Sequence, residues 1–203
     1  MISVGQRLLK ADGDLSAKAR YESFDLLKDE IGEHSDLLLS SYVLNEMDDR
    51  DVVTAVRKMW EAADKLLVIV EPGTPAGFNV IKRVRETLIS LGGLLVAPCP
   101  HDGICRIAED DWCHFTCRVP RSRLHKTIKD ASVPYEDEKY CYIAFSRKKC
   151  ERASMRVLRH PYISKGQVDL SLCTETENKE MTVRKRDGDL YKRAKRSKQG
   201  DAL

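Results

Sequence analysis

Three short apolar runs separated by two amphipathic segments constrain the fold of the first half of this chain most strongly. The runs are residues 36–41 (DLLLSS), 66–71 (LLVIVE) and 94–97 (LLVA). Their continuous apolar character is typical of buried parallel strands. Residues 48–64 and 79–93 carry apolar side chains at helical spacing, and acidic residues open the first of these segments. Alternation of strand and helix predicts an α/β fold built on an open parallel sheet.

Polar residues follow these predicted strands, at the places where parallel sheets bind their ligands. We expect the segment 40–46 and the breaker-rich loop from Glu71 to lie at the carboxyl ends of two strands. An earlier strand over 21–27, ending near Asp25, would add a third position at the same edge. Each of these residues also suits an ordinary strand-to-helix turn. Residues 2–10 have the spacing of the end of a helix.

The composition supports a folded protein. Hydrophobic residues make up 42% and charged residues 33% of the 203 positions, which provides enough apolar side chain for a core. No run of 18 apolar residues occurs, so we expect no membrane span. The N-terminal residues lack the pattern of a secretory signal.

Charge is distributed unevenly along the chain. Residues 1–98 hold 12 Lys and Arg against 16 Asp and Glu, a net charge of −4, whereas residues 99–203 hold 23 against 16, a net charge of +7. The second part would therefore favour phosphate groups. The alternative is an ordinary solvated surface.

Changes in composition divide the chain into three regions. We expect a partial α/β region over 1–97, a cysteine-rich loop over 98–117 and a basic region with short strands over 118–203. Within the last region the pattern predicts a helix over 118–130, strands over 136–148, 154–160, 166–173 and 180–186, and a basic terminal helix or tail over 189–198.

The seven cysteines all lie after residue 98. Their odd number argues against a secreted disulfide scaffold and favours reduced thiols inside a cell. Cys99, Cys105 and Cys113 lie within 15 residues of one another and could surround one metal centre. Spacing alone leaves zinc and an iron–sulfur cluster as equal alternatives. The candidates for a fourth ligand are Cys117, Cys141, Cys150, Cys173, His101 and His114, although the alternating strand around Cys141 favours a buried thiol there.

Six motifs resemble the small-ribosomal-subunit methyltransferase-like family, whose members occur in bacteria and mitochondria. They are SSYVLNE (40–46), VEPGTPAGF (70–78), APCPHDGIC (97–105), DDWCHF (110–115), YEDEKYCYIAFSR (135–147) and VRKRDGDLYKRAKRSKQGD (183–201). The resemblance covers nearly the whole chain, in order. The form of the motifs is more similar to bacterial members, which implies the bacterial cytoplasm, with the mitochondrial matrix as the alternative.

The resemblance implies a class I S-adenosylmethionine methyltransferase fold and a 4Fe–4S cluster. It assigns the cluster to Cys99, Cys105, Cys113 and Cys173. The family's glycine-rich cofactor loop is not among these residues, so the chain resembles an N-terminally truncated copy and we expect weak S-adenosylmethionine binding. The cofactor residues that remain are Asp25 at the adenine edge, Ser40, Ser41, Tyr42 and Asn45 on the methionine side, and Glu71 and Thr74 near the methyl acceptor.

The resemblance implies a protein that binds small-subunit ribosomal RNA during subunit assembly or translation, with a structural cluster, and we expect it to be a monomer. The alternative is an active rRNA methyltransferase in a full-length form, and a redox or iron-sensing role stays open as a third. No residue is a convincing catalytic base. The basic residues expected to contact RNA are Arg118, Arg121, Arg123, Lys126, Arg184, Lys192, Arg193, Lys195 and Arg196.

Overall fold

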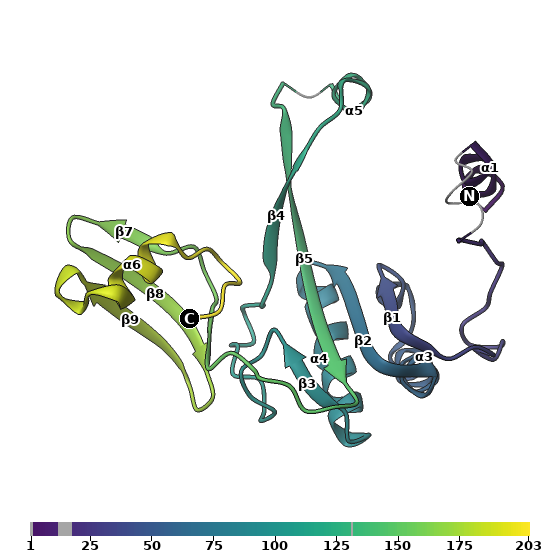
Figure 1. The fold of residues 1–203 in the computed structure, drawn as a ribbon, viewed down its shortest axis with the longest axis horizontal. Helices are drawn as coiled ribbons and strands as arrows, with labels where there is room; N and C mark the ends of the chain where they lie inside the picture. The colour runs from purple at the N-terminus through teal and green to yellow at the C-terminus, as the bar shows by residue number, and fades with distance from the viewer. Residues whose placement is uncertain (1, 12–17, 131) are drawn as a thin grey trace.

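Two β-sheets form the frame of the protein, and an irregular cysteine-containing segment of the first sheet contacts the second (Figure 1). The computed structural model describes residues 2–11, 18–130 and 132–203. Residues 98–114, between β3 and β4, lie outside helices and strands, as the sequence predicts for most of the cysteine-rich loop. Among the described helices, none combines the length and the apolar character needed to cross a bilayer.

The first sheet contains five strands: β1 (Ser35–Ser41), β2 (Ala63–Pro72), β3 (Leu94–Ala97), β4 (Phe115–Pro120) and β5 (Tyr135–Ser146). β1 and β2 are parallel, and β5 lies between β2 and β3, antiparallel to both. The three apolar runs are therefore strands that share one direction, as predicted. The predicted parallel sheet is thus confirmed in part, because β5 is antiparallel to its neighbours; an apolar run reports burial and not the identity of the neighbouring strand.

Two helices cover one face of this sheet. α3 (Asp49–Ala62) and α4 (Pro75–Ser90) pack against each other and bury the core side chains of β2 and β5. α4 begins four residues earlier than the pattern predicts. The hydroxyl of Thr74 accepts a hydrogen bond from the Gly77 N–H at 3.1 Å, and a proline occupies the first turn, where its missing N–H costs nothing.

The opposite face of β1 is open. Leu38 packs against the core on the helix side, whereas Leu37 and Leu39 point the other way and remain 56% and 61% exposed. α1 (Ile2–Ala11) lies beyond β1 and buries no residue (Figure 1).

The strand predicted over 21–27 does not form. Asp25 lies instead in a turn, where its carboxylate accepts hydrogen bonds from the N–H groups of Leu27 and Lys28 at 3.1 and 3.3 Å. A strand needs a paired neighbour for its backbone, and this segment pairs with none of the described strands. Asp25 therefore does not lie at a strand end, and the short polar side chain stabilises the turn.

β4 and β5 continue beyond the sheet as a two-stranded arm (Figure 1). Its tip carries α5 (Arg123–Ile128), and the Ser122 hydroxyl accepts the His125 N–H at 3.1 Å to cap it. The predicted helix over 118–130 is shorter than expected because residues 118–120 pair with β5.

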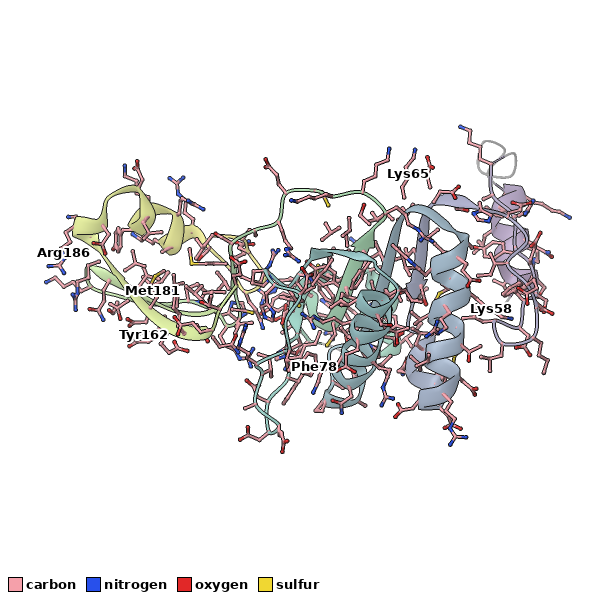
Figure 2. The ribbon with its side chains drawn as sticks, turned by 90° about the horizontal axis from the view of Figure 1, so that it is seen from below. Lys58, Lys65, Phe78, Tyr162, Met181 and Arg186 are labelled. Atoms are coloured by element: carbon pink, nitrogen blue, oxygen red, sulfur yellow. The ribbon has the colours of Figure 1, made fainter. Side chains whose placement is uncertain are left out.

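The second sheet is antiparallel. β8 (Gln167–Thr174) pairs with β6 (Met155–Val157) and β7 (Tyr162–Ser164) on one side and with β9 (Asn178–Arg184) on the other. α6 (Asp189–Arg196) packs on its core through a buried alanine. Tyr162 and Arg186 mark the far end of this sheet (Figure 2). The sequence range 118–203 thus contributes to both sheets, and the three-residue strand β7 was too short for the pattern to reveal.

Candidate functional site

A cavity of about 40 Å³ lies where the irregular segment meets both sheets. It has room for more than a single water molecule. The walls come from α4, the segment 98–114, β4, β5, and the second sheet. Five of the seven cysteines line it: Cys99, Cys105, Cys113, Cys141 and Cys173.

The four cysteines assigned by family resemblance are thus brought to one place. Cys99, Cys105 and Cys113 come from the irregular segment, and Cys173 comes from β8 of the second sheet. Burial, with a smaller contribution from neighbouring thiols, raises the pKa of Cys99 and of Cys113, and it raises the pKa of Cys173 to about 11. Four deprotonated thiols here would repel one another, so their ligand form requires a cationic centre among them.

Among the described residues, these cysteines do not form a ready-made site for a single metal ion. A tetrahedral zinc site with Zn–S bonds of about 2.3 Å holds its sulfurs roughly 3.8 Å apart. Within residues 2–11, 18–130 and 132–203, no group of three or more His, Cys, Asp or Glu is arranged to hold a metal ion. The potential donors are four thiols around a shared space, and thiolates are ligands of both zinc and iron–sulfur clusters.

The other candidate ligands differ in burial and in whether they line the cavity. Cys141 is 1% exposed and its Sγ donates a hydrogen bond to the Cys113 carbonyl oxygen at 3.0 Å. Cys117 and Cys150 are exposed and do not line the cavity. His114 stacks on a tryptophan outside the lining, whereas His101 is 5% exposed and lies on the cavity wall.

Arg85 holds the first part of the irregular segment. It lies on the buried face of α4 with 5% exposure, and its Nη2 donates to the carbonyl oxygens of His101 at 2.8 Å and Gly103 at 2.6 Å. Its positive charge also lowers the pKa of Cys99, against the larger effect of burial. The sequence analysis did not single out Arg85.

The second sheet holds the same segment from the other side. Arg156 Nε donates to the Pro98 carbonyl oxygen at 2.8 Å, and Asn178 Nδ2 donates to the Arg106 carbonyl oxygen at 3.0 Å. The Arg159 guanidinium pairs with the Asp111 carboxylate. The irregular backbone therefore has side-chain partners from both sheets in place of a regular hydrogen-bond ladder.

Most of the residues predicted to bind S-adenosylmethionine lie at the carboxyl edge of β1 and β2. Glu71 is fully buried, and its carboxylate accepts the N–H groups of Leu44 at 2.9 Å and Asn45 at 3.3 Å. Burial raises the pKa of Glu71, while these two N–H groups act to lower it. This carboxylate thus holds the short 3-10 helix η1 (Leu44–Glu46) against β2.

The remaining residues of that set differ in accessibility. Ser40 is buried and its hydroxyl has no partner within the described chain, whereas Ser41, Tyr42 and Asn45 are exposed. Tyr42 adopts the left-handed backbone conformation with φ of 57°. Thr74 caps α4. The structure thus brings six predicted residues to one edge and leaves Asp25 outside it.

The basic residues of the arm that are predicted to contact RNA differ in whether an acidic side chain pairs with them. Arg118 donates to both carboxylate oxygens of Asp137 at 2.7 and 2.8 Å, and Arg121 pairs with Glu136 at 3.3 Å. Arg123 is exposed and Lys126 is half-buried. The ion pairs of the described arm residues involve neither of these two.

α6 presents a second basic surface. Arg193, Lys195 and Arg196 are exposed in its last turn, and Lys192 pairs with Asp189 at 2.9 Å. Arg184 is exposed at the end of β9. Tyr191 packs against the second core, so it is a packing residue in this structure.

A family model described as "Mitochondrial small ribosomal subunit Rsm22" matches residues 1–203. The chain belongs to the Rsm22 family. This confirms the resemblance to the small-ribosomal-subunit methyltransferase-like family that the motifs indicated.

The chain is also similar to individual proteins. The human "Ribosome assembly protein METTL17, mitochondrial" is 25% identical over 187 residues, which are 83% of this chain and 39% of the human protein. The "Rsm22-cox11 tandem protein 2, mitochondrial" of Schizosaccharomyces pombe is 34% identical over 84 residues, covering 35% of this chain and 11% of that protein. The chain thus spans well under half the length of these two relatives.

Proposed function

We propose that this Rsm22-family chain is a ribosome-assembly factor that binds small-subunit ribosomal RNA and carries a structural 4Fe–4S cluster. The family match and the name of the human relative support the assembly role. The convergence of four cysteines on one cavity is the observation that carries the cluster. Those relatives are named as mitochondrial proteins, which favours the mitochondrial matrix over the bacterial cytoplasm.

In this proposal Cys99, Cys105, Cys113 and Cys173 hold the cluster. Thiolates are the ligands of such clusters, and irregular spacing suits them better than it suits a zinc knuckle. The cluster would fasten the segment 98–114 to β8. It would act together with the side-chain hydrogen bonds that already hold this segment from α4 and from the second sheet.

RNA would meet the two basic surfaces. Arg123 and Lys126 on the arm, and Arg193, Lys195 and Arg196 on α6, have no acidic partner among the ion pairs of the described residues. Charges without a protein partner are available to phosphates, which dominate the affinity of RNA-binding proteins.

Binding is favoured over methyl transfer for these residues. Glu71, which the resemblance places near the methyl acceptor, is the best candidate for a catalytic base. It is buried, and its carboxylate accepts hydrogen bonds from two backbone N–H groups. Thr74 serves as a helix cap. The Glu71 carboxylate is therefore not free to act as a base, and methyl transfer remains the alternative for a full-length form.

Filter binding tests the RNA proposal. The anaerobically purified chain is titrated against small-subunit ribosomal RNA and against a large-subunit fragment of equal length, across a salt series. We expect tighter binding to the small-subunit RNA at every salt concentration, with an affinity that falls steeply as salt rises. Equal affinity for both RNAs would contradict a small-subunit role. Iron and sulfide analysis of the same sample, with about four irons per chain expected, tests the cluster separately.

A further inference from the structure

Two buried nitrogen atoms on the wall of the cysteine cavity lack hydrogen-bond partners. They are Nε of Arg85 and Nδ1 of His101, and both residues are 5% exposed. Buried polar atoms in folded proteins nearly always have a partner, so an unpaired one calls for an explanation such as an absent group. Both residues line the same cavity as the four thiols.

The position of the Arg85 guanidinium is fixed by its other nitrogen. Nη2 donates to the carbonyl oxygens of His101 and Gly103 at 2.8 and 2.6 Å. Rotating the side chain to find a partner for Nε would break both bonds. The Nε–H therefore remains at the buried wall, on a residue that lines the cavity.

The charge of the wall defines what that group can be. Arg85, Arg106, Arg156 and Lys82 line the cavity, whereas none of its described lining residues is Asp or Glu. Arg156 is fixed by its bonds to the carbonyl oxygens of Pro98 and Gly200 at 2.8 and 2.9 Å. A wall with this excess of cations suits an anionic occupant that accepts hydrogen bonds.

We propose that Arg85 Nε and the His101 ring donate hydrogen bonds to sulfur atoms of the cluster and thereby raise its reduction potential. This inference rests on the 4Fe–4S cluster of the proposed function. A neutral imidazole has one N–H, and the proposal places it on Nδ1. Arg85 would then be a positioning residue with two tasks, because one nitrogen holds the segment and another contacts the occupant.

The effect on the potential follows from charge. Reduction adds a negative charge to a centre that four thiolates already make anionic. Hydrogen-bond donors to its sulfurs and nearby cations stabilise the reduced form more than the oxidised form. Removing either donor should therefore make the cluster harder to reduce.

A reductive titration of three variants tests this inference. Arg85→Gln removes the cation and the Nε donor, His101→Ala removes the ring donor but keeps the backbone carbonyl that Arg85 binds, and Arg83→Gln is the matched control. Arg83 lies on the same helix but pairs with Asp49 at 2.6 Å outside the cavity. Dithionite supplies one electron per cluster, and the reduced fraction is followed by electron paramagnetic resonance together with the iron content.

We expect the ratio of reduced to oxidised cluster at a fixed potential to fall at least tenfold in Arg85→Gln, which is a midpoint shift of about 59 mV for a one-electron couple. His101→Ala should shift in the same direction by less, and Arg83→Gln should not shift. If Arg85→Gln fails to fold or to retain iron, the midpoint potential of His101→Ala alone decides whether the inference holds.

An unchanged midpoint in His101→Ala and in any iron-loaded Arg85→Gln would overturn the inference and leave the cluster itself standing. An unaltered chain that holds no iron after anaerobic purification and reconstitution would overturn the proposed cluster, and the inference with it.

Discussion

Cys141 Sγ, on the central strand β5, donates a hydrogen bond to the backbone carbonyl oxygen of Cys113 at 3.0 Å. Burial and, to a smaller extent, the charge of Glu71 raise the pKa of Cys141 to about 12. The thiol therefore stays protonated and acts as a donor at neutral pH. It joins the irregular segment to the first sheet without being one of the proposed cluster ligands.

Replacing Cys141 should lower stability without removing iron. Cys141→Ser keeps a donor of similar size and should change the free energy of unfolding little. Cys141→Ala loses the hydrogen bond and leaves a small cavity, which should cost about 1–2 kcal/mol. Anaerobic urea unfolding measures the difference, with the exposed Cys117→Ala as control. Loss of iron in both Cys141 variants would instead identify it as a ligand.

Cys173 and Cys150 offer a direct test of the ligand assignment. Cys173 lines the cavity from β8, whereas Cys150 is exposed outside it. Cys173→Ser should reduce the iron content well below about four per chain, because a serine hydroxyl is a poor replacement for a cluster thiolate. Cys150→Ser should retain the full content. Iron analysis after anaerobic purification compares them, and the reverse pattern would refute the assignment.

The pattern of apolar residues located most strands and helices but not their neighbours; it placed a strand over 21–27 that does not form, and it missed β4 and β7. Continuous apolar runs located β1, β2 and β3, and alternation around Tyr142 located β5. Periodicity says which face of a strand is buried, and it carries no information on pairing partners. The insertion of β5 between β2 and β3 is a long-range property that emerged only in three dimensions.

Only part of the site could be predicted from the sequence, because its residues are far apart along the chain. Three clustered cysteines were visible from spacing, but Cys173 came only from family resemblance, since 60 residues separate it from Cys113 in the sequence. Arg85 was missed although a signal existed. It interrupts the apolar face of α4 between Ile81 and Leu88, and a charged residue at such a position needs a buried partner.

Glu71 should make stability depend on pH in a defined direction. Burial raises its folded-state pKa above the ordinary value of 4.5. The folded state therefore binds the proton more tightly than the unfolded state. The stability that this provides is fully present below about pH 4.5 and is lost as pH rises through the folded pKa. The stability of the natural chain relative to Glu71→Gln should thus decline over that range.

The two Glu71 variants also separate charge from hydrogen bonding. Glu71→Gln keeps an acceptor for the Leu44 N–H, whereas Glu71→Ala leaves buried N–H groups unpaired and should cost about 2–3 kcal/mol. Chemical unfolding at several pH values measures both effects. A stability difference from Glu71→Gln that does not change with pH would show that the folded pKa is not raised.

Variants of the arm test which of its basic side chains contact RNA. Arg118 is neutralised by Asp137 and lies over the Tyr135 ring at 3.9 Å, so its side chain is already engaged. Arg123 and Lys126 take part in no ion pair of the described arm. Changing these two to Ala should flatten the log–log salt dependence of RNA affinity by about 0.7 per lost phosphate contact. Arg118→Ala should leave the slope unchanged; a larger loss from Arg118→Ala would reverse this ranking.

The basic turn of α6 provides the last test. Its charged side chains are exposed, and the helix packs through Ala194 and Leu190, so replacing the charges should not disturb the second core. The quadruple variant carries Ala at Lys192, Arg193, Lys195 and Arg196. If these residues meet phosphates, it should bind small-subunit RNA more weakly whatever the RNA sequence, with a salt slope lower by about 0.7 per lost contact.

The control for α6 removes the same net charge elsewhere. It carries Ala at four exposed positions of the N-terminal half: Lys10, Arg50, Arg57 and Lys65. A change in overall charge alone would weaken RNA binding similarly in both quadruple variants, whereas a contact at α6 affects only the first. Filter binding across a salt series distinguishes these outcomes. Matching slopes for the α6 variant and the natural chain would exclude α6 from the RNA interface and leave the arm tip as its basic contact.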